Sequence, residues 1–344
     1  MGKSSKPVLI ITPGDPAGVG PEITVKALQS KALSQTLKKF DILCVGASAP
    51  FRKMGIPLKL ATYDGLGRLE LSSSSRGIHF LEAPEKAPRK TLLAGFQSGW
   101  SIVTAVQLIQ KGYAQALVTG PISKERLQRG GFAYFGHTDL LADLCGVDEK
   151  FTMMLANDLI KVSLVTSHLS LRDVPSAVTR PRIRRAVNQT IEALDLWWKV
   201  KKPRIAVAAL NPHAGEGGIL GHEEQKVITP EIRFLQKKWR GRAEIVGPLP
   251  SDTLFAQHCW GNQRDRFDAV VCMYHDQGLI PAKTLDFPNT VNVTLGLPII
   301  RTSVDHGTAF DIAGKNIADP SSMRAAITLA AQLIRQPHSI GAKP

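Results

Sequence analysis

The sequence predicts an α/β protein with mostly parallel sheet, divided between two domains. Short apolar runs rich in β-branched residues alternate with longer helical stretches along the chain, which is the order expected when helices cover both faces of parallel strands. Several of these runs end at Gly-Pro or at a histidine, as strands do where an α/β sheet opens toward a ligand. At 344 residues the chain is long for one hydrophobic core and suits two.

The first half of the chain carries the clearest strand and helix signals. A strand over 8–11 leads into the Gly- and Pro-rich loop TPGDPAGVGPE, and Pro21 suits the first turn of the helix that follows. The other expected elements are a strand over 42–45, a helix over 98–111 and a buried strand over 116–119. The last clear helices are expected over 183–196 and 323–335.

Three further apolar runs share one feature, because each ends just before a histidine. They are 161–166 before His168, 205–210 before His213, and 269–273 before His275. A single buried histidine is more often a hydrogen-bonded core ring than a metal ligand. Three at equivalent strand ends favour a divalent-metal or substrate site, since the carboxyl ends of parallel strands meet at one edge.

Charge and composition exclude several classes of protein. The net charge of +14 could indicate a nucleic-acid-binding protein, but the basic residues gather in short patches and no recognised binding motif accompanies them. We therefore expect no nucleic-acid partner, and no membrane, because no apolar segment is long enough to span one. The four cysteines show no CxxC spacing, which predicts reduced thiols and a cytoplasmic location.

The most specific string is VDHGTAFDIAGKNIADP, over 304–320. Gly307 and Gly314 would let the backbone approach a ligand closely, and Asp311 could accept hydrogen bonds from both hydroxyls of a ribose. The string resembles the adenosine-binding loop of the isopropylmalate and isocitrate dehydrogenases, with Asn316 where those loops usually carry Gly. The resemblance implies that His306, Gly307, Asp311 and Asn316 bind the cofactor. It also implies NAD rather than NADP, since a carboxylate at Asp311 repels a 2′-phosphate.

Other strings follow in order along nearly the whole chain. They are TPGDPAGVGPE, TGPISKE, FGHTDLLAD, TSHLSLRDVP, ALNPHAGEGG, GPLPSDTLF and YHDQGLIPAK. Together with the 304–320 loop they resemble the 4-hydroxythreonine-4-phosphate dehydrogenase family. That resemblance implies an isocitrate/isopropylmalate dehydrogenase-like fold of α/β/α layers and a homodimer, with the active site in an interdomain cleft and completed across the dimer interface. It suggests a discontinuous cofactor domain over 1–123 and 290–344, and a metal, substrate and dimerisation domain over 124–289.

The same resemblance assigns roles to single residues. His168, His213 and His275 would bind one divalent ion (Zn, Co or Mg), with one of them, His275, contributed by the partner subunit. The substrate residues would be His137 and Thr138 of the GHT motif together with Lys283, Asn292 and Arg301. Asp139 stands where the family often has Glu, which changes the reach of that acid.

The implied reaction is the NAD-dependent and metal-dependent oxidation of 4-phosphooxy-L-threonine. The 3-oxo acid would lose its carboxylate to give 3-amino-2-oxopropyl phosphate, a step toward pyridoxal 5′-phosphate. Lys283 is our candidate for the base that removes the hydroxyl proton, because an interior lysine beside a cation has a depressed pKa; Asp276 is the alternative.

Two other activities remain open on the sequence alone. A sister activity in the same family would oxidise 4-phospho-D-threonate or 4-phospho-D-erythronate in sugar-acid breakdown, and the motifs do not separate it from the first. A metal-dependent phosphohydrolase would use the same histidines, but it would leave the 304–320 loop unexplained and usually needs more carboxylates.

Overall fold

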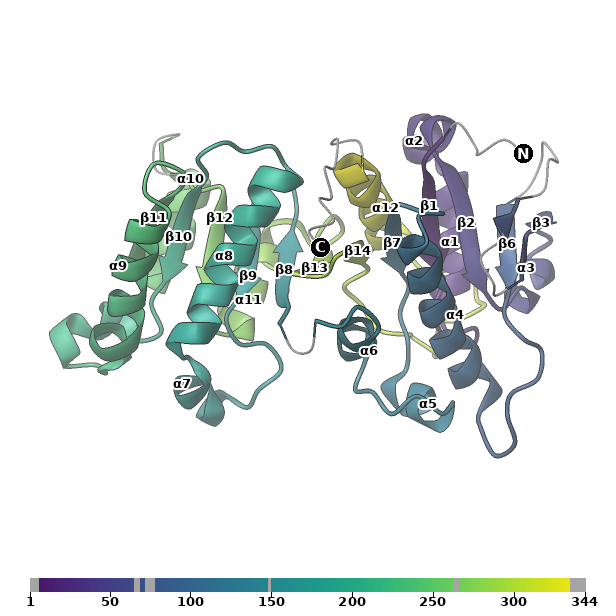
Figure 1. The fold of residues 1–344 in the computed structure, drawn as a ribbon, viewed down its shortest axis with the longest axis horizontal. Coiled ribbons are helices and arrows are strands. Elements are labelled where there is room, and N and C mark those ends of the chain that lie inside the picture. Colours follow the sequence, from purple (N-terminus) through teal and green to yellow (C-terminus); the bar gives the residue numbers. More distant parts are fainter. Residues whose placement is uncertain (1–5, 65–68, 72–77, 148–149, 263–265, 335–344) are drawn as a thin grey trace. The chain divides into compact units, whose positions relative to one another are not determined.

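The computed structural model of the chain describes residues 6–64, 69–71, 78–147, 150–262 and 266–334 (Figure 1). These residues form two compact units. Unit 1 comprises the described residues of Met1–Glu149 and Leu297–Arg335, and unit 2 those of Lys150–Gly296. Within the described ranges, no helix is both long and apolar enough to cross a membrane.

The sheet of unit 1 is parallel throughout the pairs that the structure describes. Its strands run in the order β14 (Ile300–Ser303), β7 (Ala116–Thr119), β1 (Val8–Thr12), β2 (Asp41–Gly46), β6 (Ile78–Glu82) and β3 (Leu58–Leu60). A small antiparallel pair, β4 (Thr62–Tyr63) and β5 (Leu69–Glu70), stands apart from it. The central strands β1 and β7 are fully buried, which explains why both read as unbroken apolar runs.

Helices from both ends of the chain cover this sheet. They are α1 (Gly20–Gln29), α2 (Ser34–Lys39), α3 (Ala49–Lys53), α4 (Leu93–Gln110), α5 (Lys124–Arg129), α6 (His137–Leu144) and α12 (Ser321–Ile334), with a short 3₁₀ turn at Lys31–Leu33. Residue 335, the expected end of the last helix, lies outside the described residues. Both α5 and α6 pack on α4 and so belong to unit 1 by contact, whereas the sequence placed them in the second domain. The functional division at 123/124 and 289/290 stays a prediction.

Unit 2 has a mixed sheet. Its order is β11 (Glu244–Leu249), β10 (Arg204–Ala208), β12 (Ala269–Cys272), β9 (Lys161–Leu164), β8 (Thr152–Ala156) and β13 (Val291–Leu295). The first four strands are parallel, while β8 is antiparallel to both of its neighbours. A short turn joins β8 to β9, as an antiparallel pair allows. Neither β8 nor β13 is among the strands predicted from the sequence.

Helices lie on both faces of the unit 2 sheet (Figure 1). Ile205 and Val207 of β10 pack in one apolar cluster with α8 (Arg180–Leu196) and α9 (Thr229–Lys238). Ala206 and Ala208, on the opposite face, pack with α10 (Ser251–Trp260) and α11 (His275–Asp286). This alternation gives the α/β/α layers that the sequence predicted. The remaining elements are α7 (Val174–Ala177), 3₁₀ turns at Leu171–Asp173 and Pro212–Gly218, and a π-helical turn at Glu224–Ile228.

The four cysteines are free thiols. Cys44 and Cys272 are fully buried in strands, as expected for core residues, and burial raises the pKa of Cys44 to about 12. Burial also raises the pKa of Cys145 to about 11.

Candidate functional site

Two of the three histidines that follow predicted strands, His168 and His275, lie together in unit 2. His168 follows β9 and His275 is the first residue of α11, directly after the neighbouring strand β12. The centroids of their rings are 5.6 Å apart. Two imidazoles on one tetrahedral zinc, with Zn–N bonds of about 2 Å, hold their ring centroids about 5 Å apart. The pair therefore fits a shared divalent ion.

Asp276 determines which ring nitrogen of His275 carries the proton. Its Oδ1 lies 2.6 Å from Nδ1 of His275. Because a carboxylate only accepts hydrogen bonds, Nδ1 carries the proton and donates it, which leaves the lone pair on Nε2 free for a metal. Asp276 thus orients a candidate ligand.

The third histidine lies on an unusual turn after β10. His213, Ala214, Gly215, Glu216 and Gly217 all have positive φ, from 42° to 79°. Three of them are not glycine, and each costs roughly 1–2 kcal/mol in this left-handed conformation. The side chain of His213 is 66% exposed, and its Nδ1 lies 3.6 Å from Glu216.

The described residues contain no group of three or more His, Cys, Asp or Glu side chains placed to hold a metal ion. The structure therefore brings His168 and His275 together, and it does not bring His213 to them within one chain. The three-histidine site of the sequence analysis stays a prediction.

Lys283 and Asn292 belong to the same unit. Lys283 lies on α11 and is half-buried rather than interior, with its Nζ 5.4 Å from the ring centroid of Phe287. Asn292 is a half-buried residue of β13 between the buried Val291 and Val293, so its side chain leaves the opposite face of the strand.

Unit 1 contains a buried cation, the guanidinium group of Arg301. Arg301 of β14 is 2% exposed, and its Nε and Nη2 donate to Oγ1 of Thr119 at 3.1 and 2.8 Å. Burial lowers the pKa of Arg301 to about 9, so the group remains positive at neutral pH.

The charge of Arg301 affects the pKa of His137, which lies at the start of α6. Burial and then the charge of Arg301 lower the pKa of His137 well below its usual value, so the ring is neutral at pH 7. Its Nε2 is buried and has no hydrogen-bond partner in the described part of the chain. Thr138 follows it in the first turn of the helix and is half-buried. A buried cation beside an unpaired neutral ring suits an anionic ligand with further polar groups.

The 306–320 loop is also in unit 1 and is tied to the first helix. Glu22 of α1 accepts hydrogen bonds from the backbone N–H of Ala318 at 2.9 Å and of Asn316 at 3.3 Å. Asn316 has a φ of 58°, a left-handed conformation that Gly adopts more readily than other residues. Asp311 is exposed, while Nε2 of His306 is buried and unpaired among the described residues.

A cavity of about 710 Å³ opens beside this loop. Its lining comes from the segments after β1, β2 and β6, from α1, α3 and α4, and from Ala313 and Gly314 of the loop itself. It therefore lies at the carboxyl ends of parallel strands, where α/β sheets bind ligands.

Sequence reasoning missed three buried acids around these regions. Glu22 holds the 306–320 loop through the N–H of Ala318. Asp15 accepts from the N–H of Ala17, its Oδ1 lies 3.5 Å from Arg126, and its Oδ2 has no partner within the described ranges. Glu224 contacts the turn that carries His213. Only the strings GDP and GPE, inside a loop already singled out, signalled the first two.

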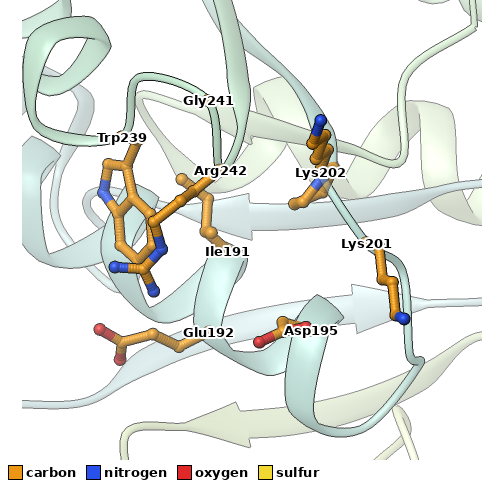
Figure 2. Close-up of a pocket in the computed structure, with 9 residues that line it drawn as sticks. Ile191, Glu192, Asp195, Lys201, Lys202, Trp239, Gly241 and Arg242 are labelled. Atoms are coloured by element: carbon orange, nitrogen blue, oxygen red, sulfur yellow. The ribbon is translucent and has the colours of Figure 1, made fainter.

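A second cavity, of about 230 Å³, lies in unit 2 (Figure 2). Exposed Lys201 and Lys202 and the acids Glu192 and Asp195 surround it, with Arg242 stacked on Trp239. Because Lys202 precedes β10 and Arg242 precedes β11, this cavity lies at the amino ends of the strands, at the opposite edge from the histidines. Two of the basic patches seen in the sequence gather here beside acidic side chains.

Known proteins resemble the chain along almost its whole length. The family model described as "Pyridoxal phosphate biosynthetic protein PdxA" matches residues 56–330. The 4-hydroxythreonine-4-phosphate dehydrogenase of Geobacter metallireducens is 43% identical, covering 99% of each chain. The crystal structure of 4-hydroxythreonine-4-phosphate dehydrogenase from Klebsiella pneumoniae has a TM-score of 0.82 and 36% identity, covering 98% of this chain and 100% of that one. A terephthalate 1,2-cis-dihydrodiol dehydrogenase from Burkholderia xenovorans is similar in fold, with a TM-score of 0.62 and 24% identity over 95% of this chain and 98% of that one.

Proposed function

Because this chain belongs to the family of the pyridoxal phosphate biosynthetic protein PdxA, we propose that it oxidises 4-phosphooxy-L-threonine with NAD. The secondary alcohol at C3 becomes a ketone, its hydride passes to NAD, and its hydroxyl proton passes to a base. The resulting β-keto acid loses its carboxylate as CO₂ and leaves 3-amino-2-oxopropyl phosphate.

The observation that carries this proposal is the pairing of His168 with His275 at the carboxyl ends of β9 and β12. His168, His275 and His213 would together hold a divalent metal, with one of the three ligands contributed by the partner subunit. Such an ion polarises a secondary alcohol and lowers its pKa. Asp276 fixes the ring of His275 through Nδ1. Imidazole ligands with few carboxylates favour Zn or Co, and Mg is the further candidate.

The substrate's anionic groups are the second part of the proposal. Arg301 offers a positive charge that burial keeps away from water, and we propose that it faces an anionic group of the substrate. His137 offers Nε2 without a charge, and Thr138 adds a hydroxyl. Lys283 and Asn292 are proposed to hold the other polar groups of the substrate from unit 2.

Lys283 is our candidate for the base that takes the hydroxyl proton. It is half-buried on the same helix as His275. Asp276 is less suited to this role, because its Oδ1 already accepts from His275.

The 306–320 loop is proposed to bind the adenosine of NAD through His306, Gly307, Asp311 and Asn316. Its neighbour, the cavity of about 710 Å³, is large enough for part of a dinucleotide. The exposed carboxylate of Asp311 would accept from the ribose hydroxyls and repel the 2′-phosphate of NADP.

We further propose a cytoplasmic homodimer. The free cysteines suit a reducing compartment, and the incomplete histidine set in the described chain suits a site completed by a second copy. Light scattering on the purified protein gives the mass that decides the second point.

The deciding experiment measures initial NADH formation on 4-phosphooxy-L-threonine and on 4-phospho-D-threonate, each before and after chelation and after re-addition of Zn²⁺. We expect metal-dependent NADH formation with preference for the amino compound. Preference for the threonate would instead place the protein in sugar-acid breakdown. Phosphate release without NAD would indicate a phosphohydrolase and overturn the proposal.

A further inference from the structure

The turn that carries His213 has a conformation that its own residues do not favour. Five consecutive residues have positive φ, and His213, Ala214 and Glu216 are among them. Neighbouring contacts must hold such a turn in place. One local bond within it joins the N–H of Leu220 to the carbonyl of Gly215, at 3.1 Å.

Glu224 supplies buried contacts just ahead of the turn, while Gln225 donates to the carbonyl of Gly217 within it at 2.6 Å. This carboxylate is 3% exposed. Its Oε1 accepts from the backbone N–H of Leu210 and of Asn211, each at 2.8 Å, and its Oε2 accepts from Nδ2 of Asn211 at 2.9 Å. These bonds fix Leu210 and Asn211, the second of which stands two positions before His213.

Close packing around the turn leaves no room for a side chain at Gly215 or Gly221. A Cβ added to Gly215 would lie 2.8 Å from Oε2 of Glu224, and one added to Gly221 would lie 2.4 Å from Nδ2 of Asn211. The carboxylate of Glu224 therefore packs directly against Gly215 of the turn. A change in the position of this carboxylate should also move the turn.

We infer that Glu224 is a positioning residue for His213, which it holds in the left-handed turn so that the ring can bind the divalent metal. This inference deepens the proposed function and rests on it for the ligand role of His213. The hydrogen bonds of Glu224 go to residues 210–211, so it acts on His213 through this segment.

The test compares Glu224→Ala, Glu224→Gln and a matched control, Glu231→Ala. Glu231 is also a buried glutamate, 1% exposed, a short distance along the same helical segment. It pairs with Arg184 and, among the described residues, forms no hydrogen bond or ion pair with the turn. Gln keeps an oxygen that can accept from both backbone N–H groups, so it should restore much of the effect.

The first readout is the Kd of the metal-free protein for Zn²⁺, measured by chelator competition without substrate. We expect Glu224→Ala to weaken binding by about tenfold or more, as loss of a residue that orients a ligand does, and Glu231→Ala to leave the Kd unchanged. In a His213→Ala background, Glu224→Ala should have no further effect on the Kd. An unchanged Kd in Glu224→Ala, or an equal loss in Glu231→Ala, would overturn the inference.

The second readout is amide hydrogen exchange over 211–220, which needs neither metal nor activity. Glu224→Ala should speed exchange there and Glu231→Ala should not; equal protection in both variants would remove the positioning role. If His213→Ala had the same Kd for Zn²⁺ as the wild type, the metal assignment in the proposed function would be wrong, whatever the exchange result.

Discussion

Glu22 accepts a hydrogen bond from the backbone N–H of Ala318 at 2.9 Å, although 296 residues of chain separate the two. Lys26, one turn further along α1, adds bonds to Glu22 and to the carbonyl of Ala318. The first helix of unit 1 thus holds the far end of the loop that we assign to the cofactor.

Replacing Glu22 should therefore loosen the cofactor loop. For Glu22→Gln we expect the KM for NAD to rise about fivefold to tenfold with kcat nearly unchanged, because a hydrogen bond to a charged group contributes about 1.5–3 kcal/mol and part of that is lost. Glu125→Gln is the control, since it removes only an exposed ion pair with Arg129. A rise in KM for the phosphorylated substrate alone would contradict this role.

The loss of unfolding free energy at acid pH also depends on Glu22. Burial alone would raise the pKa of Glu22, but its hydrogen bonds from Lys26 and from the N–H of Ala318 outweigh burial and lower it. A lowered carboxyl pKa stabilises the fold above the unfolded value of about 4.5 and loses that contribution as the pH falls below it. Urea denaturation should show a smaller loss of unfolding free energy below pH 4.5 in Glu22→Gln than in the wild type.

His137 gives a pH dependence of the same sign, but at a higher pH. Its lowered pKa means that the unfolded chain binds more protons below about pH 6.5, so folding stability falls as the pH drops through that range. The fall in melting temperature between pH 7.5 and 5.5 should be smaller in His137→Gln than in the wild type. Identical falls in both proteins would show that the ring is not buried in neutral form.

Asn316 tests the backbone of the cofactor loop. With φ at 58°, Asn316→Gly should be neutral or slightly stabilising, while Asn316→Val should lower the free energy of unfolding by about 1–2 kcal/mol. Equilibrium urea unfolding measures both. Equal stability of the Gly and Val variants would mean that the residue does not keep this conformation.

Cofactor choice tests Asp311. We expect Asp311→Ala to lower kcat/KM for NAD and raise the ratio of NADP to NAD turnover, because a carboxylate that repels a 2′-phosphate is removed. Glu125→Gln is again the control, as an exposed acid elsewhere in unit 1. A wild type that already prefers NADP would refute the assignment.

Asp276 and Lys283 can be separated by two variants. Asp276→Asn keeps an oxygen for Nδ1 of His275 but loses its charge, so we expect Zn²⁺ affinity to weaken about tenfold while saturating metal restores much of kcat. Lys283→Met should leave metal affinity intact and abolish the proton-transfer step. Full loss of kcat in Asp276→Asn at saturating metal would transfer the role of base to Asp276.

The family, the α/β architecture and the carboxyl-end placement of the histidines were predicted from the sequence and are confirmed. Buried parallel strands such as β1 and β7 are continuous apolar runs, so their pattern is local and readable. The direction of β8 is not local, because its antiparallel pairing with β13 joins residues more than 130 positions apart.

The site was less readable for a similar reason. The glycines after His213 indicate a turn, but nothing in the string shows that His213 and Ala214 are themselves left-handed. Hydrogen bonds from distant acids, Glu22 and Glu224, fix both loops. A lysine in an apolar stretch was predicted to be interior, yet Lys283 is half-buried, because α11 exposes part of its surface.

The discontinuous make-up of unit 1 bears on how the chain folds as it is synthesised. The described part of unit 2 is one contiguous segment, but β14 and α12, which pack on β7, are made only after it. At the usual 5–20 residues per second, the edge of β7 waits roughly 10–40 s for its partner strand on the ribosome. During that interval the nascent chain presents an unpaired apolar edge, so β7 is the segment that a chaperone would have most reason to shield.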